Sequence, residues 1–185
     1  MTATDRITSR DSENWPPVDQ LFRLAQAYLD CSHHAFSAIV RSRLPRSFEH
    51  VRAAAHLFEQ ALEIFFKGAI MSATGEPVAG HNLHTLHNDF RSHYGDRFTF
   101  VSDIDAFSKW NPPWAHAEYT RYPFDKNGQK WPQPLFISLE YALSQTASLK
   151  HDFNMIVPEI CSVTHDQTAS EGLDDIAAGA EGLEP

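Results

Sequence analysis

The sequence predicts an all-α protein, an up-and-down helical bundle of about five helices. Three observations carry this prediction. Apolar residues recur with the 3.6-residue period of amphipathic helices over several long segments. No segment alternates apolar and polar residues as a half-buried strand does, and no hairpin dipeptide joins two such runs. The 185 residues are 42% hydrophobic, which suits one sizeable core. We therefore expect a single helical domain at residues 17–161.

Proline, serine and glycine delimit the first two helices. The first apolar stripe begins at Val18, after a Trp-Pro-Pro run, and continues to Val40, before Pro45. The second helix follows Ser47, an N-cap candidate, and ends at Gly75, which supplies a stop signal. Because the second helix is apolar nearly all round, we expect it at the centre of the bundle.

Three shorter or later helices complete the predicted bundle. A third helix extends from Asn82, which can cap it, to Tyr94. A short fourth helix is expected at residues 101–110, and the Asn-Pro-Pro-Trp run that follows should end it. The last helix is expected at about residues 134–153. The long loop between the last two helices is rich in aromatic residues and proline, and loops of that length in compact domains are usually functional.

The net charge of −9 is concentrated at the C-terminal end of the chain. Residues 162–185 contain six acids and no Lys or Arg, and the remaining chain has 18 acids against 15 bases. We expect a disordered acidic tail at 162–185, because it has few large apolar residues to offset the entropy of ordering. Residues 1–16 are expected to form a flexible leader. The nearly neutral body lacks the strongly basic surface of proteins that coat nucleic acid.

Several classes of protein find no support in the sequence. No apolar run approaches the roughly 20 residues of a membrane-spanning helix, and the N-terminal segment lacks the apolar stretch of a secretory signal. We therefore expect a cytoplasmic protein with no membrane partner. Cys31 and Cys161 lack CxxC spacing, so neither a disulfide framework nor a structural zinc site is predicted. No GxSxG, Gly-rich phosphate loop or paired-carboxylate motif favours a hydrolase or a P-loop enzyme.

Three histidines, His81, His84 and His87, occur within eleven residues. On a helix only His84 and His87 are neighbours, because His81 precedes the expected cap and lies about 240° round the axis from His87. The spacing also differs from that of an HExxH zinc helix. We interpret His84 and His87 as surface or capping residues, and we expect no metal and no cofactor.

A stripe of polar residues follows the central helix at spacings of three and four. Its members are Arg52, His56, Gln60, Glu63 and Lys67. One interpretation is a solvated helix edge with a weak Glu63–Lys67 ion pair. The other is a face turned toward the long loop, where the guanidinium of Arg121 could pair with Glu63 through two hydrogen bonds.

A group of arginines surrounds the corner between the first two helices. It comprises Arg41, Arg43, Arg46 and Arg52. These side chains either solubilise the corner or hold a phosphate or an RNA backbone.

Three fragments taken together resemble the HEPN domain, a helical nucleotide-binding or RNA-linked module. They are Gln60-Ala-x-Glu63-x-x-x-Lys67 in the core helix, His81-Asn-Leu before the next helix, and Arg121-Tyr122-Pro in the loop before the last helix. Their order and spacing match the family across roughly residues 18–155.

The resemblance implies a HEPN-like bundle that binds a nucleotide, RNA or a nucleotidyltransferase partner protein, without catalysis of its own. Such domains are commonly dimeric, so we expect a homodimer. The ligand-binding residues that the resemblance implies are Gln60, Glu63, Lys67, His81, Tyr119, Arg121 and Tyr122.

The alternative that the resemblance leaves open is a metal-independent ribonuclease of toxin–antitoxin type. Family members of that kind use an Arg-x(4–6)-His motif near the start of the last helix. This chain departs from the motif, because His116 precedes Arg121 and the next histidine is His151. The alternative therefore requires a dimer that brings His116 and Arg121 of two chains together, with histidine as the general acid and base.

Overall fold

The structure, a computed structural model, describes residues 15–102 and 138–178, with side chains of the last helix described up to residue 162. These residues form four helices and no strand: α1 (Pro17–Val40), α2 (Phe48–Thr74), α3 (Leu83–Tyr94) and α6 (Leu139–Ala178). The all-α prediction is therefore confirmed for the described part of the chain. The short helix expected at 101–110 lies almost entirely outside it, so the count of five stays a prediction.

Local capping signals place most helix ends where the sequence predicted them. The Asn82 side-chain oxygen accepts a hydrogen bond from the Thr85 backbone N–H at 3.1 Å and so caps α3. Gly75 ends α2 with a left-handed φ of 73°, which glycine adopts without a steric penalty. Ser47 stands at the N-cap of α2, but its side chain makes no capping bond. The predicted N-cap position is therefore confirmed, although the hydroxyl lies 2.8 Å from His50 Nδ1 and does not cap the helix.

The helix α2 is the central helix of the bundle, as its apolar character predicted. It contacts α1, α3 and α6. The ring of Phe65 stacks on that of Phe153 of α6 with centroids 4.4 Å apart. Four further aromatic rings lie about 6 Å from it, those of Phe22, Phe66, Phe90 and Phe100. One aromatic cluster therefore joins all four described helices.

The helices α1 and α2 approach closely at Gly68. A Cβ atom at that position would lie 3.1 Å from a ring carbon of Phe22 and 3.2 Å from Leu21 Cβ. Both contacts are tighter than ordinary van der Waals packing. The absence of a side chain at Gly68 is what lets α1 lie directly on the central helix.

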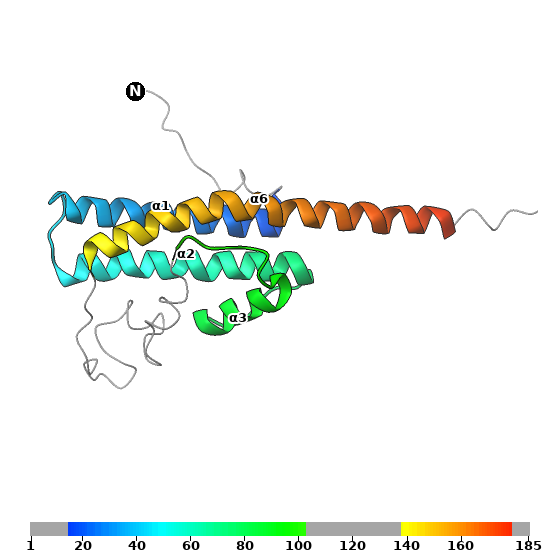
Figure 1. Cartoon of the computed structure of the whole chain (residues 1–185), viewed down its shortest axis with the longest axis horizontal. Helices are drawn as coiled ribbons and strands as arrows, with labels where there is room; N and C mark the ends of the chain where they lie inside the picture. Colours follow the sequence, from blue (N-terminus) through cyan, green and yellow to red (C-terminus); the bar gives the residue numbers. More distant parts are fainter. Residues whose placement is uncertain (1–14, 103–137, 179–185) are drawn as a thin grey trace, which may run out of the picture.

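The last helix differs from its prediction at both ends. It begins at Leu139, later than expected, and its backbone remains helical to Ala178. Part of the longer span has a clear cause, because the apolar stripe continues beyond 153 through Ile156 and Ile160, both buried in the core. The helix lies beside α1 and extends past the ends of α1 and α2 (Figure 1). Because no side chain is described after residue 162, the disordered tail at 162–185 stays a prediction.

Contacts between α1 and α6 show that the two helices are antiparallel. Near the start of α1, Asp19 Oδ1 lies 3.9 Å from Sγ of Cys161. Further along α1, His33 Nδ1 lies 2.9 Å from the hydroxyl of Thr146, much earlier in α6. The helices α2 and α6 therefore point the same way, with α1 running against both (Figure 1). Among the described residues, none of the helices has the length and apolar character needed to cross a membrane.

Candidate functional site

Three of the predicted site residues meet where the start of α3 reaches the central helix. Lys67 Nζ donates a hydrogen bond to Oε1 of Glu63, one turn earlier on α2, at 2.9 Å. His81 stands just before the cap of α3, and its Nδ1 lies 2.8 Å from the same carboxylate oxygen. We call Glu63, Lys67 and His81 the polar cluster. The cluster combines two segments of the chain, so it is a tertiary contact and not only a local ion pair within one helix.

The Glu63 carboxylate is the fixed anion of the polar cluster. Its side chain is 6% exposed, compared with 17% for Lys67 and 70% for His81. Burial alone would raise the pKa of the Glu63 carboxyl. Hydrogen bonds from Lys67 and His81, together with their charges, outweigh burial and hold the pKa below its ordinary value. Glu63 is therefore ionised at neutral pH and holds the lysine and the histidine in place.

The polar cluster and its neighbour Gln60 present mainly hydrogen-bond donors. His81 directs Nδ1 at the carboxylate, so that nitrogen carries the proton, and the side chain as a whole is 70% exposed. The Lys67 ammonium has three donors, of which the carboxylate takes one. Gln60 Nε2, one turn before Glu63, is buried without a hydrogen-bond partner among the described residues. These groups suit a ligand rich in acceptor oxygens, such as a phosphate.

The polar stripe of α2 is not a solvated edge. Arg52 and Glu63 are buried, and the three other members are partly buried: His56, Gln60 and Lys67. The interpretation as an exposed edge is therefore wrong. Its physical reason is the central position of α2, which leaves even its polar side covered.

The three neighbouring histidines have different surroundings. His81 belongs to the polar cluster, whereas His84 is exposed on α3. His87 is buried and its ring lies 5.4 Å from that of Phe66. The interpretation of His87 as a surface residue is wrong, because it lies on the side of α3 that carries Phe90 and faces α2. No group of three or more side chains suited to a metal ion occurs in the described part of the chain.

The loop residues of the predicted site lie outside the described residues. They are His116, Tyr119, Arg121 and Tyr122. The expected pairing of Arg121 with Glu63 and the ribonuclease alternative therefore stay predictions. The other predicted ligand-binding residues are all described, and they lie within about two turns of Glu63 or contact it directly.

A buried carboxylate that the sequence did not single out anchors the segment after α3. Asp152 on α6 accepts the backbone N–H groups of Val101 and Ser102 at 2.8 and 2.9 Å. It also accepts the Ser102 hydroxyl at 2.5 Å. Three donors on one carboxylate hold the segment after α3 against α6. No local pattern marks this contact, because its partners are about 50 residues apart.

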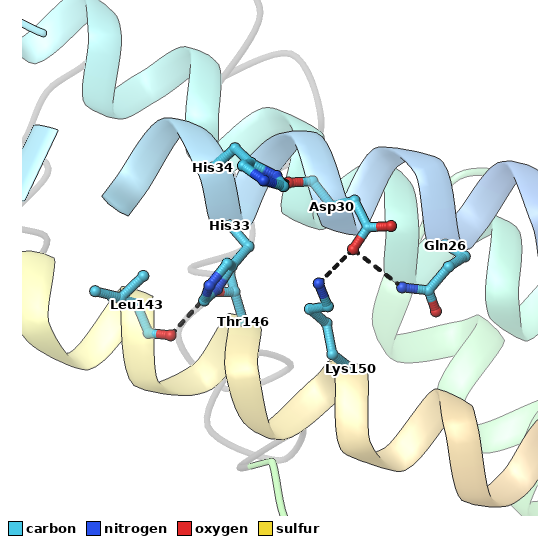
Figure 2. A network of polar contacts seen from close by, with 7 residues as sticks. All are labelled: Gln26, Asp30, His33, His34, Leu143, Thr146 and Lys150. Carbon is cyan, nitrogen blue, oxygen red and sulfur yellow. Dashed lines mark hydrogen bonds and ion pairs between the residues drawn. The ribbon is translucent and has the colours of Figure 1, made fainter. Parts of the chain in front are cut away.

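A second polar network, missed by sequence reasoning, fastens α1 to α6 (Figure 2). Lys150 Nζ lies 2.5 Å from Asp30 Oδ1. The Thr146 hydroxyl donates to the backbone oxygen of Leu143, so His33 Nδ1 is the donor in its 2.9 Å contact with Thr146. Burial, and then the nearby charge of Lys150, lower the pKa of His33. The neutral imidazole therefore acts as a link between helices.

Comparisons of the chain with protein families, with curated proteins and with solved structures find no match. The likeness to the HEPN domain therefore rests on the three sequence fragments alone. Two of these fragments are described, and they supply the polar cluster: Glu63 and Lys67 come from one and His81 from the other. The cluster is the strongest candidate for a binding site among the residues that the structure describes.

Proposed function

We propose that this bundle is a HEPN-like domain that binds a nucleotide, either free or as part of RNA, at the polar cluster, and that it has no catalytic activity of its own. The observation that carries the proposal is the convergence of Glu63, Lys67 and His81 from α2 and the start of α3. Both segments bring donors to the Glu63 carboxylate, and the two Lys67 donors that this carboxylate does not take could bind the oxygens of a phosphate.

Each member of the polar cluster has a distinct task in this proposal. The buried Glu63 carboxylate holds Lys67 and His81 in fixed positions, so less entropy is lost when a ligand binds. Lys67 offers a point charge, and Nε2 of His81 can donate to a phosphate oxygen when the ring is protonated. Because Glu63 is engaged by two donors, it is a positioning group and not a free general base.

Calorimetric titration of the full chain with ATP tests the proposal. Lys67→Ala removes the point charge and should weaken binding at least about tenfold, which corresponds to about 1.4 kcal/mol. His81→Ala should weaken it less, because the ring already donates Nδ1–H to Glu63 and can donate from Nε2 only when protonated, whereas Lys67 keeps two further donors. Lys150→Ala is the matched control, since Lys150 is also paired with a carboxylate but lies between α1 and α6. Thermal melts of each variant check that the bundle is intact.

The outcomes separate the proposal from its alternatives. Absence of binding to ATP and to single-stranded RNA would contradict it and favour a nucleotidyltransferase protein as the occupant of this face. Equal weakening by Lys150→Ala would show that the effect is one of general charge. Cleavage of RNA in the presence of EDTA would favour the metal-independent ribonuclease, with His116 and Arg121 as the residues to replace.

A further inference from the structure

A second feature, remote from the polar cluster, is the corner where α1 turns into α2. Residues 41–52 hold four of the chain's fifteen basic residues and a single acid, Glu49. We call this segment the basic corner; its arginines are Arg41, Arg43, Arg46 and Arg52. The chain as a whole carries a net charge of −9. Such a local excess of positive charge therefore stands out from the rest of the molecule.

The backbone of the basic corner is held in a defined conformation. Beyond the last turn of α1, the N–H of Arg43 donates to Ala38 O at 2.8 Å and that of Ser42 donates to Ile39 O at 3.1 Å. Ser42 has a positive φ of 56°. These are the bonds and the left-handed residue of a Schellman motif. The arginines on either side of Ser42 therefore project from a fixed turn.

Three arginines of the basic corner are exposed and have no carboxylate partner among the described residues. They are Arg41, Arg43 and Arg46. Arg46 is steadied by a hydrogen bond from Nη2 to the Val40 backbone oxygen at 3.2 Å. An unpaired guanidinium offers a planar set of donors that matches the oxygens of a phosphate.

Glu49, the one acid of the basic corner, lies among hydrogen-bond donors and positive charges. Hydrogen bonds from its own backbone N–H and from the Ser47 hydroxyl, with the charges of His50 and Arg52, lower the pKa of this carboxyl. The N-terminal end of α2 lies at the same place, and the helix dipole adds to the positive potential. The local hydrogen bonds belong to Glu49 alone, but the charge of Arg52 and the helix end would also act on an anion arriving from solution.

An aromatic ring stands among these arginines. Phe48 is 44% exposed, which is unusual for so large an apolar side chain. The guanidinium carbon of Arg52 lies 5.4 Å from the centre of its ring, so the ring is supported from within the protein. A supported ring with an open side is a surface on which a nucleic-acid base can stack.

We infer that the basic corner is a docking surface for single-stranded nucleic acid, with Arg41, Arg43 and Arg46 contacting phosphates and Phe48 stacking on a base. The combination of unpaired basic side chains with an exposed aromatic ring is the chemistry that binds single strands. An anionic membrane is less well matched, because only Leu44 and Phe48 could enter it and Phe48 already packs against Arg52. The inference deepens the proposed function, since RNA is one of its ligands, yet it needs no residue of the polar cluster.

Fluorescence anisotropy of the full chain with a labelled oligo-uridylate of about ten nucleotides, a typical single-strand footprint, tests the inference. The variant with Arg41→Gln, Arg43→Gln and Arg46→Gln should bind weakly. Its plot of log affinity against log salt should be shallower by about 2, because each phosphate contact on a single strand contributes about 0.7. The matched control, with Arg23→Gln, Arg91→Gln and Arg97→Gln, removes equal charge elsewhere and should keep the wild-type slope.

Further variants isolate the aromatic contact and guard against misfolding. Phe48→Leu should weaken RNA binding several-fold without changing the salt slope. Phe48→Tyr keeps an aromatic ring and should preserve the wild-type affinity for RNA. If the triple variant melts early because Arg46 no longer holds Val40, the pair Arg41→Gln and Arg43→Gln is compared with Arg23→Gln and Arg97→Gln. These arginines are exposed, so the paired variants should fold normally.

Each outcome decides for or against the basic corner. An unchanged salt slope in the corner variant, or an equal change in the control, would overturn the inference. The inference would also be overturned if the three arginines were required for binding to phosphatidylserine vesicles but not for binding to RNA. ATP binding should be the same in wild type and corner variant, because a mononucleotide needs only the polar cluster. Loss of ATP binding by Lys67→Ala therefore tests the proposed function separately.

Discussion

At the scale of single residues, Glu63 shows why a buried charge can be retained in a helical core. Its carboxylate has lost most of its contact with water, yet an ammonium and an imidazole bond to the same oxygen. Breaking one side of such an arrangement costs more than the arrangement itself contributes, because it leaves an uncompensated charge behind. The residue therefore couples the position of the α3 start to the central helix.

Replacement of Glu63 by Gln should destabilise the bundle by about 1 to 3 kcal/mol at pH 7, because Lys67 and His81 then lose the charged acceptor of their hydrogen bonds. The cost should shrink in acid. A carboxyl whose pKa is lowered by folding contributes its stability above its unfolded pKa of about 4.3 and loses it as pH falls through the folded value. Urea unfolding at neutral pH and at about pH 3 measures both differences.

The matched control is Glu76→Gln, at an exposed glutamate beyond the end of α2. It should change the free energy of unfolding by less than about 0.5 kcal/mol at either pH. A Glu63→Gln penalty that stays constant from neutral to acid pH would show that the carboxylate charge is not the source of the stability.

Single residues also show where sequence reasoning succeeds and where it ends. The pairing of Glu63 with Lys67 follows from their i, i+4 spacing, whereas only the resemblance to a family position points to His81. The prediction for the buried His87 is wrong, although Leu86 and Phe90 beside it on α3 mark the face that turns inward. Contacts of Asp152 with the segment after α3 had no local signal at all. Such contacts depend on which helices become neighbours.

At the scale of elements, the ends of helices were predictable where one residue type carries the capping chemistry. Asn82 and Gly75 end their helices by a side-chain oxygen and a left-handed backbone, both of which are visible in the sequence. The end of α1 was marked by Pro45, but the residue that turns the chain is Ser42. The last helix was predicted too short, because its buried stripe continues beyond Phe153.

Replacement of Ser42 by Gly should stabilise the bundle by about 0.5 kcal/mol. A left-handed conformation costs a residue with a Cβ roughly 1 to 2 kcal/mol, and the greater freedom of glycine in the unfolded chain returns part of the gain. The control is Ser37→Gly within α1, where glycine should cost about 0.5 to 1 kcal/mol. Thermal melts that show the same sign of change at both positions would contradict the role of Ser42 in the turn.

At the scale of the whole molecule, the described core contacts of the long last helix come from its part up to Cys161. The aromatic cluster around Phe65 receives Phe153, and the α6 stripe then continues through Ile156 and Ile160. Beyond this stripe α6 extends past the ends of α1 and α2 (Figure 1). The core contacts described for α6 reach Ile160 and Cys161, which packs at the edge of the same cluster.

Truncation of the chain after Ser162 should consequently leave the bundle folded, with a melting temperature within a few degrees of the full chain. The segment removed carries six acids and no base, so it adds negative charge and few large apolar side chains. Truncation after Met155 is the informative comparison, because it also removes Ile156 and Ile160. Each buried isoleucine contributes about 1.5 to 3 kcal/mol, and the melting temperature should fall by roughly 10 °C. A comparable fall for the shorter truncation would show that the acidic segment packs against the bundle and would contradict its assignment as a dispensable tail.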